Sequence, residues 1–343
     1  MNRVTTERVA QWWQAFILLT LSVKPEWTSV FRLSDNKGLN LLENMMRKLS
    51  WMLLVLLVLV GCGNEVTDEE GQALKVLVKD EVFANAGLEV VANAGLEKRK
   101  RGIVWKKDGK EMVLIPAGSF EMGDSKNELE DWMKTARPVH TVELDAFYMD
   151  VHEVTVGQFR EFVEDSGYDY QENWANVAKY SPGDGYPMVY VTWNDATAYA
   201  KWAGKRLSTE AEWEYAARGG LAGKRYPWGD EITHDNANYE GIGGRDQWIQ
   251  SSPVGSFEAN GYGLYDMAGN AWEWCQDRYG ENYYSSSPAK NPSGPGTGSY
   301  RVLRGGIRDS HTLNLRVAIR YDLLPNSKCN LSGFRCVSGS DNP

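Results

Sequence analysis

The most chemically mixed stretch of the chain is RGGIRDSHTLNLRVAIRY, at residues 304–321. A glycine pair and two later arginines frame a run that has the periodicity of neither a helix nor a half-buried strand. Ser310 and His311 are adjacent within this run, which raises the question of a nucleophile and its base. Adjacent side chains rarely face each other and no orienting acid is evident, so we expect no hydrolytic triad. His311 is expected to be an exposed loop residue.

The histidines of the sequence also do not indicate a metal site. A non-haem iron site needs two histidines and a carboxylate. The chain has four histidines, scattered without helical spacing: His140, His152, His234 and His311. We therefore expect no iron centre of this kind.

Two loops rich in oxygen-bearing side chains suit a hard cation better. The first contains Asn238 and Asp246, and the second is YDMAGNAWEW, with Asp266 and Glu273 near its ends. Calcium takes six to eight oxygens from carboxylates, amides and backbone carbonyls. A glycine-containing loop with a carboxylate at each end can wrap carbonyls around such an ion. Acidic loop residues that are merely solvated remain the alternative at this point.

The start of the chain carries a targeting pattern. Met46-Arg47-Lys48 precedes the apolar run 51–60, and Gly61-Cys62 follows it. A short basic region, an apolar core and a cysteine after small residues are typical of a bacterial lipoprotein signal. The apolar run is shorter than the ~20 residues of a spanning helix. We expect a signal peptide at 45–61 and lipidation of Cys62. Translation is expected to start at Met45 or Met46, so that residues 1–44 are an extension wrongly included in the sequence.

This pattern places the mature protein in the bacterial cell envelope, lipid-anchored and extracytoplasmic. Residues 62–110 are expected to be a tether, and a folded domain is expected at 111–338. The formal net charge of −9 argues against a nucleic-acid partner, whose phosphates need basic patches. The membrane, reached through the lipid anchor, is the expected partner.

Helix signals are few, which predicts a loop-rich domain. Thr155 and Gln158 can form a capping box for a helix that ends at Gly167. Asn194 or Asp195 can cap a second helix, 196–203. Thr209 and Glu212 can begin a third, which ends at Gly219-Gly220. After residue 220 long loops predominate, and such loops need buried aromatics, disulfides or ions to be ordered.

Seven motifs occur in order: MVLIPAGSFEMG, HEVTVGQFREF, VTWNDATAYAKWAGKRLSTEAEWEYAARGG, YPWGD, PVGSFEANGYGLYDMAGNAWEW, YRVLRGG and LSGFRC. Together they resemble the sulfatase-modifying-factor family, whose best-known member is the formylglycine-generating enzyme. The resemblance implies a compact α+β, loop-rich fold of the C-type-lectin-like kind, with little regular secondary structure and bound calcium.

The same resemblance implies two structural calcium sites. The first would use Asn238, the backbone of Tyr239, Asp246 and the backbone of Trp248. The second would use residues of the YDMAGNAWEW loop, namely the side chains of Asp266 and Glu273 and the carbonyls of Gly269 and Ala271.

The family enzyme oxidises a cysteine of a sulfatase peptide, and it uses two cysteines that hold copper. Ser310 occupies the position of the first, and the second has no counterpart. A serine hydroxyl is hard and protonated, whereas cuprous copper prefers thiolates. No catalytic residue and no copper are therefore expected.

The resemblance also implies a disulfide partner for Cys336 in the second helix, where this chain has Ala200. A bond between Cys336 and Cys329, or one that involves Cys275, stays open in an oxidising compartment.

Two functions remain. Either an oxygen-dependent oxidation persists, formylglycine generation or the oxidation of another substrate, or the domain binds a ligand and does no chemistry. The residue types at 307–313 and 321–324 favour binding, because an asparagine codon changed only at its adenines can encode every one of them. The intervening stretch NLRVAIR keeps the apolar residues and arginines of a framework. This resembles the variable region of receptors diversified by retroelements. Chance agreement is the alternative.

The predicted ligand is a peptide, protein or glycan. Trp272 and Trp274 are either aromatic neighbours of the pocket or core residues. The residues expected to line the pocket are Ile307, Arg308, Asp309, Ser310, His311, Thr312, Leu313, Tyr321, Asp322, Leu323 and Leu324.

Overall fold

The computed structural model describes residues 102–339. The expected extension 1–44, signal peptide 45–61, lipidated Cys62 and most of the expected tether lie outside the described residues. The last part of that tether, residues 102–110, belongs to the domain instead. Strand β1 (Gly102–Val104) pairs with β2 (Glu111–Ile115), and the indole of Trp105 donates to the Ala203 carbonyl at 2.6 Å.

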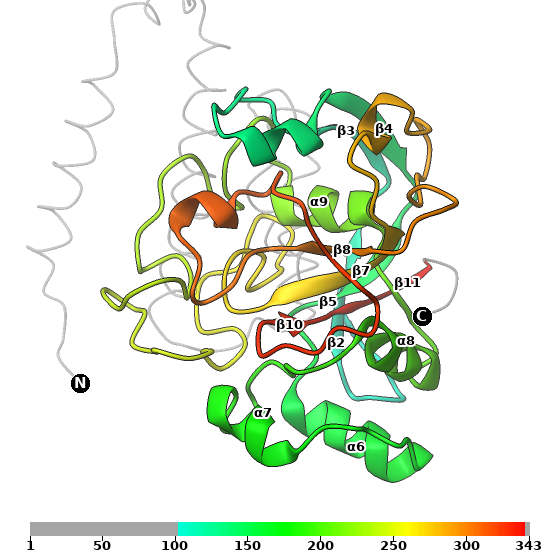
Figure 1. Ribbon diagram of the computed structural model, residues 1–343, viewed down its shortest axis with the longest axis vertical. Helices are drawn as coiled ribbons and strands as arrows, with labels where there is room; N and C mark the ends of the chain where they lie inside the picture. Colours follow the sequence, from blue (N-terminus) through cyan, green and yellow to red (C-terminus); the bar gives the residue numbers. More distant parts are fainter. Residues whose placement is uncertain (1–101, 340–343) are drawn as a thin grey trace, which may run out of the picture. The chain divides into compact units, whose positions relative to one another are not determined.

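Three sheets form the framework (Figure 1). The five-stranded sheet has the order β1-β2-β5-β11-β6, the four-stranded sheet β10-β7-β8-β9, and β3 pairs with β4. Neighbouring strands are antiparallel except for β10 and β7. The remaining strands are β3 (Gly118–Met122), β4 (His140–Leu144), β5 (Phe147–Asp150), β6 (Arg206–Leu207), β7 (Trp272–Arg278), β8 (Arg301–Arg304), β9 (Tyr321–Leu323), β10 (Ser332–Gly333) and β11 (Cys336–Gly339).

Four α-helices occur in the described part of the chain: α6 (Val156–Ser166), α7 (Trp174–Tyr180), α8 (Trp193–Trp202) and α9 (Glu210–Arg218). Short 3-10 turns occupy Asp131–Ala136, Tyr283–Ser285 and Thr312–Leu315. The predictions for α6 and α9 are confirmed, because Thr155 and Thr209 form the expected capping boxes and Gly167 and Gly219 adopt positive φ at the helix ends.

The predicted start of α8 was wrong. Its N-cap is Thr192, and Asp195 occupies the third helical position, from which its carboxylate accepts from the Thr192 backbone N–H at 2.8 Å. The reason is the capping box itself, since a threonine followed three residues later by an acid satisfies two free N–H groups, which a lone Asn or Asp does not. The sequence also missed α7, which Asn173 caps.

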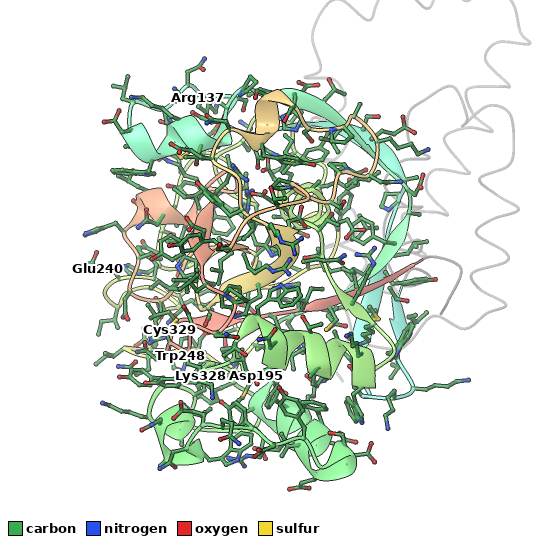
Figure 2. All side chains as sticks on the ribbon, turned by 45° about the vertical axis from the view of Figure 1, so that its right-hand side comes forward. Arg137, Asp195, Glu240, Trp248, Lys328 and Cys329 are labelled. Carbon is green, nitrogen blue, oxygen red and sulfur yellow. The ribbon has the colours of Figure 1, made fainter. Side chains whose placement is uncertain are left out.

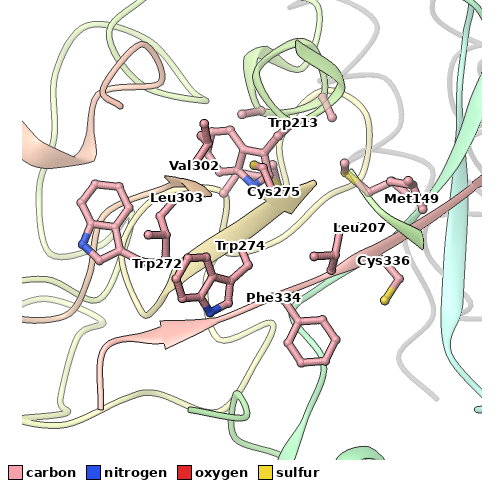
Figure 3. Packing of buried hydrophobic residues seen from close by; sticks show 14 of the residues in the cluster. Met149, Leu207, Trp213, Trp272, Trp274, Cys275, Val302, Leu303, Phe334 and Cys336 are labelled. Atoms are coloured by element: carbon pink, nitrogen blue, oxygen red, sulfur yellow. The ribbon is translucent and has the colours of Figure 1, made fainter. Parts of the chain in front are cut away.

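The hydrophobic core lies around β7 and α9. Trp213 and Trp274 are completely buried, and they pack with Leu303, Phe334 and Cys275 (Figure 3). The Trp274 indole donates to the Val191 carbonyl at 3.0 Å, which ties the core to the turn before α8. Trp274 is therefore a core residue, one of the two readings that its sequence position left open.

No helix or strand is described between α9 and β7. Hydrogen bonds from single side chains hold this long region in place. Asn260 donates from Nδ2 to the carbonyls of Ala216 and Ala217 at the end of α9, and its Oδ1 accepts from the N–H groups of Tyr262 and Leu264. The α+β, loop-rich fold class is confirmed, and this loop is why regular structure is sparse.

The described residues 102–339 contain no helix that is both long and apolar enough to cross a bilayer.

Candidate functional site

The first predicted cation loop brings Asn238 and Asp246 together in the interior. Asn238 Nδ2 lies 3.1 Å from Asp246 Oδ1, 3.4 Å from the Trp248 carbonyl and 3.2 Å from the Gln250 carbonyl. The buried Asn238 Oδ1 has no hydrogen-bond partner in the described structure. A half-turn of this amide places Oδ1 among the same three oxygens, and an all-oxygen set is what calcium prefers.

Asp246 has further neighbours in this loop. Its Oδ2 accepts from the Tyr239 backbone N–H at 3.2 Å, and Oδ2 lies 3.4 Å from His234 Nδ1. The His234 ring stacks on Tyr239 with centroids 4.1 Å apart. The predicted ligands Asn238, Tyr239, Asp246 and Trp248 therefore do converge. We call these four residues with Gln250 the first cradle.

The second predicted set is only partly brought together. Glu273 is buried, and its two oxygens accept four hydrogen bonds, three from Arg335 at 2.7, 2.8 and 3.0 Å and one from the Trp213 indole at 2.8 Å. A carboxylate has about four acceptor positions, so Glu273 serves chiefly as the partner of a buried arginine. As a cation ligand, Glu273 stays a prediction.

Glu153, which the sequence did not single out, faces Asp266 instead. Both are buried, and Glu153 Oε2 and Asp266 Oδ1 have no described hydrogen-bond partner. The other Glu153 oxygen accepts from Asn270 Nδ2 at 3.1 Å, and the other Asp266 oxygen from the Gly255 N–H at 2.6 Å. Two inward-facing carboxylates need a cation or a proton between them.

The pKa shifts of the two carboxyl groups agree with that requirement. Burial raises the pKa of Glu153 well above its ordinary value, and the neighbouring Asp266 charge raises it further. Burial also raises the pKa of Asp266. We call Glu153, Asp266 and the loop 269–271 the second cradle. The sequence signal for Glu153 was an acid within the apolar stretch VHEV that follows β5.

The predicted binding stretch 307–313 divides by exposure. Ile307, Arg308 and Ser310 are buried, whereas Asp309 and His311 are exposed and Thr312 and Leu313 are half-buried. Ser310 closes a tight turn: its N–H donates to the Ile307 carbonyl at 2.9 Å, and its Oγ accepts from the Ile307 N–H at 3.2 Å. The buried members support the loop, and the exposed members are the ones a ligand can reach.

Arg308 is held on three sides. Its Nε donates to Gln250 Oε1 at 3.1 Å, its Nη1 donates to the Asn330 carbonyl at 2.8 Å, and its guanidinium lies 5.0 Å from the Tyr180 ring centre. Its Nη2 has no described hydrogen-bond partner.

The second predicted stretch, 321–324, lies on β9 and the residue after it. Tyr321 and Leu324 are exposed, and Asp322 and Leu323 are half-buried. The Tyr321 ring stacks on Trp272 with centroids 5.3 Å apart, so Trp272 is an aromatic neighbour of this stretch. A hollow of about 400 Å³ elsewhere in the domain is lined by Asp145, Phe147, Arg206 and Glu212 among others, and by none of the predicted binding residues.

The three cysteines in the described part of the chain are unpaired. Cys275 and Cys336 are buried, and burial raises the pKa of both thiols well above its usual value. Cys329 is half-buried, with its sulfur 3.3 Å from Ser332 Oγ.

Known proteins were found that are similar to this chain in sequence and in structure. Residues 102–339 match the family described as the sulfatase-modifying factor enzyme 1-like domain. The formylglycine-generating enzyme of Streptomyces coelicolor is 40% identical over 287 residues, which cover 67% of this chain and 89% of that protein. The bovine inactive C-alpha-formylglycine-generating enzyme 2 is 34% identical, over 68% of this chain and 89% of that protein.

A third relative is a longer protein, of which the match covers less than half. The serine/threonine-protein kinase pkn1 of Chlamydia caviae is 37% identical over 77% of this chain, but the match spans only 44% of the kinase. Among solved structures, PvdO from Pseudomonas aeruginosa is similar with a TM-score of 0.59 and 28% identity, over 69% of this chain and 97% of that one.

Proposed function

Since the chain belongs to the sulfatase-modifying factor enzyme 1-like family, we propose that its domain binds a ligand and lacks the copper chemistry of the formylglycine-generating enzymes. The proposal depends on Ser310, because the resemblance to the family implies that the enzyme has its first copper-binding cysteine at this position. The Ser310 hydroxyl is buried and engaged in a turn with Ile307. A protonated hydroxyl is a poor ligand for cuprous copper.

The three cysteines within residues 102–339 offer no replacement pair. Cys275 and Cys336 are buried, and burial raises the pKa of both thiols, which disfavours the thiolate form that copper binds. Cys329 alone supplies one sulfur, and a two-thiolate centre needs two.

The proposed binding surface comprises the exposed members of the two predicted stretches: Asp309, His311, Tyr321 and Leu324. The framework around them is buried, including Arg304, Arg316 and Arg320. Side chains on such a surface can change while the framework keeps its shape. A peptide, protein or glycan is the proposed ligand, and diversification by a retroelement is the proposed origin of the mixture at 307–313.

Calcium in the two cradles is the proposed structural cofactor. Asn238, Asp246 and the carbonyls of Trp248 and Gln250 would hold one ion. Glu153, Asp266 and the carbonyls of Gly269 and Ala271 would hold the other. A bound ion supplies positive charge to otherwise unbalanced buried oxygens, and it ties loops that lack regular structure.

A second candidate function is an oxygen-dependent oxidation. The 40% identity with the Streptomyces coelicolor formylglycine-generating enzyme favours it. The similarity to a relative that is named inactive favours binding. The two candidates differ in their need for a redox metal.

The deciding experiment is metal analysis of the purified domain, with the Streptomyces coelicolor enzyme prepared in parallel as a positive control. We expect about two calcium ions per chain, no stoichiometric copper after loading with copper(I), and no oxygen consumption with a sulfatase peptide. Stoichiometric copper or peptide-dependent oxygen uptake would overturn the binding proposal.

The origin of the surface has a separate test. The gene's surroundings should contain a reverse transcriptase and a near-copy of the region that encodes 307–324. Their absence would remove the retroelement version and leave ligand binding itself open to direct assay.

A further inference from the structure

The segment 305–311 is bonded to the first cradle at two places. The Glu240 backbone N–H, next to the cradle residue Tyr239, donates to the Ser310 carbonyl at 3.2 Å, and the Glu240 carboxylate pairs with His311. Figure 2 shows Glu240 and the cradle residue Trp248 on the same flank of the domain.

Gln250 makes the second link. Its backbone carbonyl faces the Asn238 amide at 3.2 Å, and its side-chain Oε1 accepts from Arg308 Nε at 3.1 Å. One residue therefore contributes its backbone to the cradle and its side chain to the binding segment.

The second cradle holds the same segment from its other side. The Gly269 N–H donates to the Gly305 carbonyl at 2.9 Å, and the Arg308 N–H donates to the Asn270 carbonyl at 3.2 Å. Gly269 and Asn270 lie between Asp266 and Glu273 in the second cation loop.

The two cradles also touch each other. The Asn270 N–H donates to the Asn238 carbonyl at 3.0 Å. Gly269 has φ +84°, and a Cβ at this position would lie 2.2 Å from the same carbonyl oxygen. Only glycine permits this approach, so the two loops and the segment share one backbone junction.

From these contacts we infer that calcium regulates the proposed binding site, by fixing the geometry of 305–311 through the Glu240, Gln250, Gly269 and Asn270 contacts. Without a cation, the loops are held by a proton shared between Glu153 and Asp266 and by the hydrogen bonds of Asn238 Nδ2. An ion bound by several oxygens at once would replace these contacts and hold the loops more tightly. Calcium binding to the loops orders the segment 305–311, and an ordered segment in turn raises the affinity of the loops for calcium, because coupling between two sites is reciprocal. The inference rests on the proposed function for the role of the segment.

The other predicted stretch supplies an internal control. Strand β9 is held by β8, with Asp322 opposite Val302 and Tyr321 opposite Leu303. These bonds are independent of the cradles, so 321–323 keeps its order when calcium is removed.

The experiment is hydrogen–deuterium exchange of the full chain in calcium and in a chelator. We expect exchange at Glu240, Gly269 and Arg308 to be roughly 5- to 100-fold faster in the chelator, the range of typical coupling factors. Exchange in α6, α8 and β9 should change little. Unchanged exchange at Arg308, or equal acceleration across α6 and α8, would overturn the inference.

Calorimetric titration with calcium tests the reverse direction. Gln250→Ala keeps the cradle carbonyl but removes the link to Arg308, and it should weaken calcium binding by roughly fivefold or more. Gln247→Ala is the matched control, because Gln247 is exposed in the same loop and bonds within it, to the Gly244 carbonyl. Equal affinities for the two variants, or no calcium binding by the wild type, would contradict the coupling.

Neither measurement needs the ligand. A chain without any detectable ligand would defeat the proposed function and leave the exchange result standing. Conversely, a ligand that binds equally in calcium and chelator would defeat the coupling alone.

Discussion

At the scale of single residues, Asn238 has the clearest unmet requirement. It is 1% exposed, and its buried Oδ1 has no hydrogen-bond partner among residues 102–339. An unsatisfied buried acceptor costs about 1–3 kcal/mol, and a bound cation removes that cost. We therefore propose that an ion occupies this position.

Asn238→Ala is expected to abolish most of the stabilisation that calcium gives through the first cradle. For wild type, calcium at a hundred times its dissociation constant should raise the free energy of unfolding by about 2.7 kcal/mol per site. Urea denaturation with calcium and with chelator measures this gain. Asn176→Ala, in the exposed face of α7, is the control and should keep the full gain, and a full gain in Asn238→Ala would remove the residue from the site.

Glu153 shows what residue types alone do not reveal. Asp266 stood out because it lies in a loop of oxygen-bearing residues, whereas Glu153 lies far away in the sequence within an apolar stretch. Only the fold brings the two carboxylates face to face. In the same way, Glu273 was identified from its loop, and its engagement by Arg335 depends on the parallel pairing of β10 and β7.

At the scale of elements, α9 depends on its first turn. The Thr209 hydroxyl accepts from the Glu212 N–H at 3.1 Å, and the Glu212 carboxylate accepts from the Thr209 N–H at 2.8 Å. Thr209→Ala should lower the free energy of unfolding by about 1 kcal/mol, since it removes one half of the capping box. Thr209→Ser keeps the hydroxyl and should stay close to wild type in the same denaturation experiment. An equally large loss of unfolding free energy in the serine variant would show that the packing of the threonine methyl group, and not the cap, is responsible.

A buried ion network joins α9 to β8. Glu214 Oε2 accepts from Arg304 at 2.6 Å, and Glu214 Oε1 accepts from Arg218 at 2.7 Å. Burial acts to raise the pKa of Glu214, but the two arginines outweigh it and the pKa is lowered. A lowered carboxyl pKa gives stability that is complete above the ordinary value of 4.5 and is lost as the pH falls below it.

Glu214→Gln should therefore cost about 3–5 kcal/mol at pH 7, because it leaves two buried guanidinium groups undercompensated. The difference from wild type should shrink as the pH falls below 4.5, where the Glu214 carboxyl of the unfolded wild-type chain begins to be protonated while the folded one stays charged. Denaturant unfolding at pH 7 and pH 4 measures both values. Glu164→Gln on the exposed face of α6 is the control, and a difference that grows on acidification would contradict the sign.

The elements that could be predicted are those whose signals are local. Capping boxes and terminal glycines gave α6 and α9 because both partners lie within a few residues. For α8, Thr192 was overlooked beside Asn194 and Asp195, and α7 is too short to have a clear periodicity. The loops from Gly219 to Ala271 have no local signal, because contacts such as Asn260 with the end of α9 fix them.

At the scale of the whole molecule, the family and the α+β fold followed from motifs spread along 112–336. The domain boundary did not, because Gly102–Lys110 resembles a charged linker in composition. Its fold depends on distant partners: the buried Asp108 accepts from Lys205 and from Tyr199. Such pairs become visible only once the chain is folded.

The position of the domain in the cell is a property of the whole chain, and we predict that it depends on Cys62. In a bacterial host, the full chain should incorporate labelled fatty acid and sediment with membranes, since attached acyl chains give stable anchoring when more than one is present. Cys62→Ser should lose the label and shift to the soluble fraction, with its calcium-dependent stability unchanged because the cradles lie entirely within 102–339. Cys329→Ser is the control and should remain labelled and sedimentable. Membrane sedimentation of Cys62→Ser at the wild-type level would show that lipidation of this cysteine does not hold the protein at the membrane.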